Sequence, residues 1–517
     1  MSRVLILLMF VLWLAWKPEY CRPTGLGGAQ SLALFLGGYA LLVLGTGLWS
    51  RWLARRLTGR NFGRGLRRFN RLMFVARALV PIWFAAGVAG LRWWQSVNGH
   101  LQLSDFDLTP TIIGVVLGTL PAFLAWSALW WAQYPAEIAF REQNLLAQLD
   151  ADLPVHRPPT FANYFAANVR LQLLFMVVPV LMIVLLHDLI RLAASIAVGS
   201  GWRLNDPENP FTWLAAAALV FVLAPEALRR VLHTEPLASS PLRRRLEALC
   251  RRTGVKYRQI LLWHTHNNLC NAAVMGVLPR VRYILLSDLL LETMTDEQIE
   301  AVFAHELGHI VHRHMAWLVV FITVLMLFNL GGGPWVTRWV EALGLSDHAQ
   351  VVQGVFVASS FLFQFLVLFG FGSRRFERQA DVFAARTMEL SRPPAPPAAA
   401  PDLVLVPNQL PAPASGGAVL MPAARLAPAL EPGHVGHYGA AVFGSALERV
   451  ALVNNIPIKA RSWCHGSIAT RMRYLQELSA DPTRTARFDR FMLLLYGALV
   501  FALFAGAAFC WASNALP

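Results

Sequence analysis

Apolar runs long enough to cross a lipid bilayer recur along this chain of 517 residues. A membrane-spanning helix needs about 20 mainly apolar residues, because the hydrocarbon core of a bilayer is about 30 Å thick. The chain is 56% hydrophobic and only 15% charged, which is too apolar for an ordinary soluble protein. The runs predict spans near residues 3–16, 31–50, 72–91, 111–132, 171–190, 210–226, 316–333, 351–371 and 491–512. The first run could instead be a signal peptide, although no small-residue cleavage pattern follows it.

The arginine content of one loop predicts the orientation in the membrane. Residues 51–71 contain eight arginines and no acidic residue, so the positive-inside rule assigns them to the cytoplasm. Counting spans from that loop assigns residues 227–315 and 373–490 to the cytoplasm as well. The net charge of +15 does not indicate nucleic-acid binding, because the arginines lie beside apolar spans and no binding motif accompanies them. We expect a multi-pass protein of a bacterial inner membrane, with the bilayer as its partner.

The pentapeptide HELGH at residues 305–309 carries the strongest chemical signal. His305 and His309 are four residues apart, so on a helix they lie on one face, about one turn from each other. Neutral imidazoles at this spacing can hold a zinc ion while Glu306 acts on a water molecule. Thr295, followed three residues later by Gln298, fits a capping box at the start of this helix.

Zinc needs a third protein ligand and one open position. A metzincin continuation would require glycine and histidine where the chain has His312 and Met315. Glu377 and Asp381 are four residues apart, so a helix would present both carboxylates to the same side. We expect Glu377 to bind the metal and Asp381 to orient a histidine or an arginine. A solvated helix, with both acids paired to neighbouring arginines, is the structural alternative.

The order of these motifs resembles that of the membrane-embedded gluzincin metallopeptidases, the family of type I CAAX prenyl endopeptidases and HtpX-type heat-shock proteases. The matching segments are NAAVMG at 271–276, HELGH, residues 377–381 and residues 465–471. The similarity covers roughly residues 235–390 and 440–478. The usual His-Pro pair of the last motif reads His465-Gly466 in this chain.

The resemblance implies that residues 271–276 form an edge strand beside the zinc. An extended polypeptide substrate could pair with that strand, so Asn271, Ala272 and Ala273 are the expected substrate-binding residues. For Asn271, a cap of the turn at the strand end is the structural alternative.

The expected mechanism is metal-assisted peptide hydrolysis. One Zn²⁺ per chain would be held by His305, His309 and Glu377, with a position left for water. Glu306 would take the proton of that water and deliver it to the leaving amine. A second donor to the oxyanion would be His465 or Arg471. Arg471 could equally pair with Asp381 and support the fold.

The predicted fold class is mainly α. It is a multi-pass transmembrane helical bundle with a small α+β, zincin-like catalytic unit on the cytoplasmic side. Residues 257–263, 271–276 and 281–286 are expected to form a three-stranded sheet, and the helix that carries HELGH is expected to continue into the next span. The expected domains are a membrane domain 1–226, a peptidase core 227–390, a Pro/Ala-rich insertion 391–436, the rest of the peptidase 437–480 and a last span 491–512.

These observations predict an integral-membrane zinc endopeptidase that cleaves membrane-associated or misfolded membrane proteins. A CAAX-type protease that processes prenylated proteins is one alternative. A zinc-protease-like signal transducer is another, but the loops predicted outside are too short for a sensor domain. A catalytically silent scaffold would not need Glu306. The sequence leaves open the substrate, the oligomeric state, and whether residues 391–436 form a linker or a gating flap.

Overall fold

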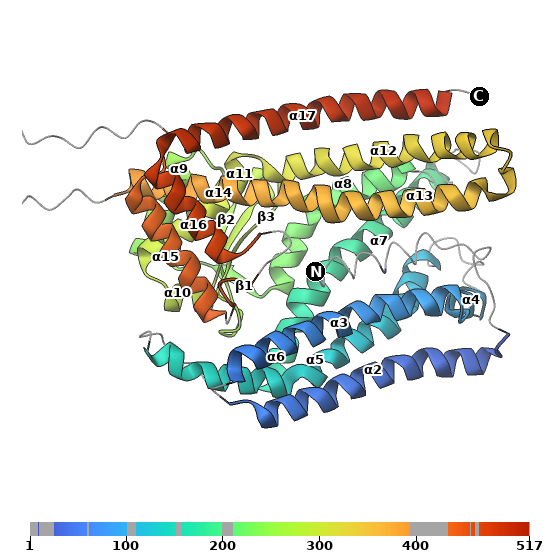
Figure 1. Cartoon of the computed structure of the whole chain (residues 1–517), viewed down its shortest axis with the longest axis horizontal. Helices are drawn as coiled ribbons and strands as arrows, with labels where there is room; N and C mark the ends of the chain where they lie inside the picture. The colour runs from blue at the N-terminus through green and yellow to red at the C-terminus, as the bar shows by residue number, and fades with distance from the viewer. Residues whose placement is uncertain are drawn as a thin grey trace, which may run out of the picture. The chain divides into compact units, whose positions relative to one another are not determined.

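Helices form most of the described chain, and one small sheet accompanies them (Figure 1). The computed structural model describes residues 9, 25–58, 61–100, 110–150, 158–198, 210–392, 433–454, 456–460 and 465–515. The chain divides into two units. The first comprises Met1–Thr295 with Arg449–Pro457, and the second comprises Asp296–Glu448 with Ile458–Pro517. Most of the Pro/Ala-rich stretch 391–436 lies outside the described residues.

Seven helices among the described residues are long and apolar enough to cross a bilayer. They are Gly28–Arg56, Phe62–Ala89, Ile112–Gln143, Phe161–Ala193, His314–Ala342, Val352–Leu390 and Pro482–Ser513. They overlap seven of the predicted spans, and the protein is a multi-pass membrane protein. The predicted span 3–16 lies almost entirely outside the described residues. The predicted span 210–226 is helical but is not among the seven. The end of its helix carries three charged residues, Glu226, Arg229 and Arg230.

The first unit begins with a helical bundle. Its helices are α2 (Gly28–Arg56), α3 (Phe62–Ala89), α4 (Trp93–His100), α5 (Pro110–Asp150), α6 (Phe161–Asn168), the π-helix η4 (Val169–Leu174), α7 (Phe175–Val198), α8 (Pro210–Val231), α9 (Pro241–Arg252), the 3₁₀-helix η6 (Pro279–Val281) and α10 (Asp288–Thr293). Helix α5 packs against α2 and α3, and α7 packs against α8. The fully buried rings of Phe35, Phe84 and Trp126 belong to the core that joins α2, α3 and α5. Burying such large apolar side chains stabilises the bundle.

The sheet of the first unit has four strands in the order β1-β2-β4-β3. The strands are β1 (Thr234–Pro236), β2 (Gln259–Trp263), β3 (Ala272–Met275) and β4 (Tyr283–Ser287). Strands β2 and β4 are parallel, β3 is antiparallel to β4, and β1 is antiparallel to β2. The three predicted strands are present, but the prediction of only three was wrong. Strand β1 has three residues, too few for an alternating pattern.

The second unit contains the helix that carries HELGH. Its helices are α11 (Asp296–Val311), α12 (His314–Ala342), the 3₁₀-helix η7 (Ser346–His348), α13 (Ala349–Phe363), the π-helix η8 (Gln364–Phe369), α14 (Gly370–Leu390), α15 (His437–Val453), whose last residues belong to the first unit, α16 (Ile468–Ala480) and α17 (Pro482–Ala515). Figure 1 shows α12 beside α13 and α17, and these pairs pack against each other. Helix α11 packs against α14, the contact that brings the site together.

The expectation that the HELGH helix continues into the next span is wrong. Helix α11 ends at Val311, and α12 begins at His314. Between them Arg313 has a φ of 53°, in the left-handed region, which ends a right-handed helix. On an uninterrupted helix, position 314 would lie about 140° around the axis from position 309. The break therefore changes which side chains can reach His309.

Gly439 permits a close approach of α15 to α14, and we expect Gly439→Ala to destabilise the protein. A Cβ at position 439 would lie 1.9 Å from the carbonyl oxygen of Ala385, so the two helix backbones would have to separate. Overpacking of this kind costs about 1–3 kcal/mol. The matched control is Gly444→Ala on the same helix, because a Cβ there meets nothing within 4 Å. Thermal unfolding should show a lowered midpoint for Gly439→Ala only, and equal midpoints would contradict the close approach.

Candidate metal centre

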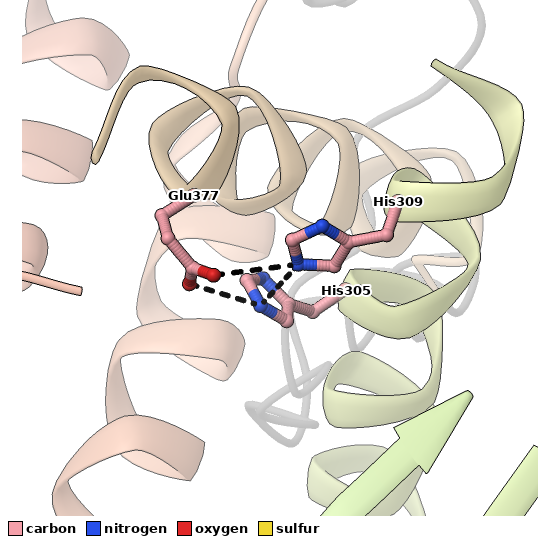
Figure 2. Close-up of side chains that lie close together, drawn as sticks. All are labelled: His305, His309 and Glu377. Atoms are coloured by element: carbon pink, nitrogen blue, oxygen red, sulfur yellow. Dashed lines mark hydrogen bonds and ion pairs between the residues drawn. The ribbon is translucent and has the colours of Figure 1, made fainter. Parts of the chain in front are cut away.

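Two imidazoles from one helix and a carboxylate from another meet in the second unit (Figure 2). His305 and His309 lie one turn apart on α11, and Glu377 lies on α14. One potential ligand atom from each of the three residues lies within 4.8 Å of the others. The residues singled out in the sequence as candidate metal ligands therefore share one location.

The Nε2 atoms of both rings face each other and the carboxylate of Glu377. His305 Nε2 and His309 Nε2 are 3.3 Å apart, and they lie 3.6 Å and 3.7 Å from the two oxygens of Glu377. Two imidazole nitrogens and a carboxylate are the donor set that Zn²⁺ accepts in catalytic sites. Two ring nitrogens directed at each other beside a carboxylate also leave a position that suits a cation. The residues present therefore fit a metal ion.

Asp381 fixes the orientation of His305 from the far side of the ring. Its Oδ1 lies 3.0 Å from His305 Nδ1, which leaves Nε2 to face Glu377. The guanidinium of Arg471 on α16 donates to both oxygens of Asp381, at 2.9 Å from Nε and 2.5 Å from Nη2. The Asp381 side chain is buried, so this paired cation offsets the cost of burying its charge. Asp381 thus contacts both a histidine and an arginine.

His309 has a partner that the sequence analysis did not identify. The break before α12 brings His314 Nδ1 to 2.9 Å from His309 Nδ1. The other ring nitrogen of His314 lies 2.9 Å from Oε1 of Gln379, which also accepts a hydrogen bond from Tyr496. Such contacts set the tautomer and orientation of a metal-binding imidazole. No sequence pattern indicated His314, because its position depends on the left-handed residue before it.

Small and flat side chains bring the elements of the site together. A Cβ at Gly308, the glycine of HELGH, would lie 3.1 Å from Ala380 Cα, so glycine lets α11 approach α14 closely. The ring of Phe443 on α15 stacks on His305 with centroids 5.6 Å apart. Phe443 is buried, so it shields one face of the imidazole from solvent. The packing of three helices thus fixes the ring positions.

The surroundings set the charge states of the α11 side chains. Burial raises the pKa of Glu306 to about 7, against the opposing positive charge of His305. Burial, reinforced by His305, lowers the pKa of His309 to about 3, so His309 is neutral as a metal ligand must be. Burial alone would lower the pKa of His305, but hydrogen bonds to Asp381 and Glu377 raise it to about 9. The two carboxylates therefore favour positive charge at this position.

His465 contacts the cluster from the segment that precedes α16. Its Nδ1 lies 2.9 Å from Oε2 of Glu377, and its side chain is 57% exposed. His465 thus contacts the cluster with one ring nitrogen while much of its side chain remains exposed to solvent. Both candidate oxyanion donors lie near the cluster, but both guanidinium contacts of Arg471 given above go to Asp381.

Asn271, Ala272 and Ala273 belong to the first unit, at and next to β3. Strand β3 pairs with β4 and lies at the end of the strand order, so it is an edge strand. The Asn271 backbone N–H donates to Ser287 Oγ at 2.9 Å, and the Asn271 carbonyl accepts from the Ser287 N–H at 3.0 Å. The Asn271 side chain is exposed. The segment is anchored through its backbone.

Part of this chain resembles a known protein family. Residues 236–434 match the sequence model of peptidase family M48. This part of the chain is therefore similar to the peptidases of family M48. That family consists of metalloproteases, and the three-residue cluster of Figure 2 lies within the matched residues.

Several known proteins resemble part of this chain. A CAAX prenyl protease 1 homolog of Arabidopsis thaliana is 29% identical over 160 residues, which cover 29% of this chain and 38% of the relative. A protease HtpX homolog of Neisseria meningitidis is 29% identical over 150 residues, which cover 27% of this chain and 51% of the relative. The chain thus matches between about a third and a half of the length of these relatives.

Among solved structures, the crystal structure of S. mikatae Ste24p aligns with a TM-score of 0.44 at 12% identity. The alignment covers 85% of this chain and 98% of that chain.

Proposed function

We propose that this protein is an integral-membrane zinc endopeptidase. The observation that carries the proposal is the joint location of His305, His309 and Glu377 in a domain of a metalloprotease family. Glu306, one residue from His305 on the same helix, adds a carboxyl group whose pKa lies close to neutral pH. A purely structural metal site would have no use for such a group.

His305 and His309 would bind zinc through Nε2, and Glu377 through its carboxylate. When bound, zinc supplies Lewis acidity, which polarises a carbonyl group and lowers the pKa of a water molecule to about 7. Glu306 accepts the proton of the attacking water and returns it to the amine as the peptide bond breaks. A carboxyl group that titrates near neutral pH suits both transfers.

Asp381 and Arg471 act as positioning residues. Asp381 holds the His305 ring through Nδ1, and Arg471 neutralises the buried carboxylate of Asp381. Because Arg471 is engaged there, we assign the second contact with the oxyanion to His465. Its exposed ring beside Glu377 supports this role.

The expected substrate is an extended polypeptide. The outer edge of β3 can accept an added strand through its backbone groups, which is a common mode of peptide binding. Asn271, Ala272 and Ala273 are the residues that we assign to this contact. Misfolded or membrane-associated proteins are the proposed substrates, and prenylated proteins are the second candidate because CAAX prenyl protease 1 homologs are similar to part of the chain.

We assign the active site to the cytoplasmic side of a bacterial inner membrane. Residues 51–71, with eight arginines and no acid, support a cytoplasmic loop between α2 and α3. Within the second unit, α11 precedes the span His314–Ala342, and α14 ends the next span, Val352–Leu390. Two consecutive spans return the chain to the side from which it started. The count from the arginine-rich loop requires α8 to cross the membrane as well.

One assay tests the function and compares the two substrate classes. The purified full-length protein is incubated with an unfolded membrane protein and, separately, with a farnesylated CAAX peptide. We expect cleavage of the unfolded protein, loss of cleavage with a zinc chelator and recovery when zinc is restored. Preferential cleavage of the farnesylated peptide would favour the second candidate. Cleavage that persists in the chelator would contradict a zinc endopeptidase.

A further inference from the structure

A polar cavity of about 260 Å³ lies in the helical bundle of the first unit, built by residues other than those of the metal centre. Its polar lining comes from α3, α5, the region of α6 and the turn before β3. The lining includes Arg77, Gln133, Glu137, Arg141, Tyr164 and Asn268. Such a lining is unusual between membrane-spanning helices, where ionisable side chains are costly and mark functional sites.

The cavity carries an excess of positive charge. It contains two guanidinium groups, Arg77 and Arg141, and one carboxylate, Glu137. Arg141 uses its Nε for Glu137, 3.3 Å away, and its Nη1 for the side-chain oxygen of Asn268, 3.1 Å away. Arg77 has no ion pair with a carboxylate among the residues that the structure describes, and the partner of its Nη2 is the neutral amide of Gln133, at 2.9 Å.

The Arg77 guanidinium also has an unused donor. Its Nε is buried and makes no hydrogen bond within the described part of the chain. Beside it, Gln133 donates to the hydroxyl of Tyr164, whose own proton can still be donated to a ligand. A partly buried cation that lacks a carboxylate partner is costly unless another anion pairs with it. The lining is therefore suited to an acceptor-rich, negatively charged group such as a phosphate.

The depth of the cavity in the membrane indicates the source of that group. The guanidinium of Arg51, at the start of the arginine-rich stretch, lies over the ring of Trp131 on α5, 5.3 Å from its centroid. Tryptophan and arginine in such contacts are typical of the membrane–water interface. Gln133, Glu137 and Arg141 follow Trp131 along α5, in the last part of the candidate span Ile112–Gln143, so we expect the cavity to lie near the lipid headgroups. Phosphates of anionic lipids are concentrated there.

We propose that this cavity binds the phosphate of an anionic phospholipid headgroup, with the Arg77 guanidinium as the main contact and Arg141 as the second. The ligand would lie where Arg141 of α5 meets Asn268 of the turn before β3. It would therefore join the helical bundle to the sheet within the first unit. This inference does not depend on the protein being a peptidase.

The test measures lipid binding by native mass spectrometry of the full-length protein in detergent. Titrations use phosphatidylglycerol, phosphatidylcholine and inorganic phosphate. We expect preferential retention of phosphatidylglycerol and a loss of affinity of roughly tenfold or more in Arg77→Gln, because a charge-assisted hydrogen bond is lost. Arg77→Lys should retain most of the affinity. Arg67→Gln is the matched control, since Arg67 is an exposed arginine of the same helix.

A second variant, Arg141→Gln, gives the test an independent arm should Arg77→Gln fail to fold. Weaker binding of phosphatidylglycerol by Arg141→Gln, with Arg67→Gln unchanged, supports the proposal. Unchanged affinity in Arg141→Gln and in any folded Arg77→Gln would overturn it. Equal retention of phosphatidylcholine would also overturn it. Displacement of the lipid by millimolar inorganic phosphate would assign the site to a soluble anion and contradict the lipid headgroup.

Discussion

Glu306→Gln should reduce peptide hydrolysis roughly 10²–10⁴-fold while zinc content and unfolding midpoint stay the same. Glutamine has nearly the shape of glutamate but cannot accept the proton of the attacking water. The three proposed ligands are not altered, so metal binding should persist. The measurement is the initial rate of cleavage of an unfolded membrane protein, with bound zinc determined on the same preparation.

The matched control for this variant is Glu297→Gln. Glu297 lies on the same helix but is exposed in its first turn, so its replacement should leave the cleavage rate unchanged. Full activity in Glu306→Gln would show that Glu306 is not the general base. A loss of bound zinc in that variant would instead show that Glu306 takes part in holding the metal.

Arg471→Met should lower the free energy of unfolding by about 3–5 kcal/mol, because it leaves the buried Asp381 carboxylate without its cation. The same variant should weaken zinc binding, since Asp381 orients His305. Chemical unfolding of the second unit and a zinc titration measure the two effects. Arg473→Met is the control, because Arg473 is an exposed arginine of the same helix.

A double variant separates charge pairing from general packing. Asp381→Asn removes the buried charge, so adding it to Arg471→Met should recover most of the lost stability. The neutral amide can still accept a hydrogen bond from His305. If the double variant is as unstable as the sum of the single variants, the two side chains are not coupled.

Regular helical geometry explains why much of the site could be predicted from the sequence. Residues four apart share a face of a helix, which made His305 and His309 one pair and Glu377 and Asp381 another. The structure brings both pairs together through the contact of α11 with α14. Seven of the nine predicted spans coincide with described helices that are long and apolar enough to cross a bilayer, because an apolar run depends only on local composition.

What the sequence could not predict depends on backbone irregularities and distant packing. His314 reaches His309 because Arg313 adopts a left-handed conformation, which no periodic pattern indicates. Phe443 stacks on His305 because Gly439 lets α15 approach α14, and that depends on a contact between distant segments. The sequence left Arg471 open between a contact with the oxyanion and a pair with Asp381. Its hydrogen bond to Asp381 likewise depends on the position of α16.

The most direct test of the account is the zinc content of the purified protein, measured by elemental mass spectrometry. We expect one zinc ion per chain in the natural protein and in Glu306→Gln. Glu377→Ala and His309→Ala should retain less than about a tenth of that amount, because each removes one of three protein ligands. A natural protein without zinc, or a Glu377→Ala variant that keeps a full equivalent, would contradict the proposed metal centre.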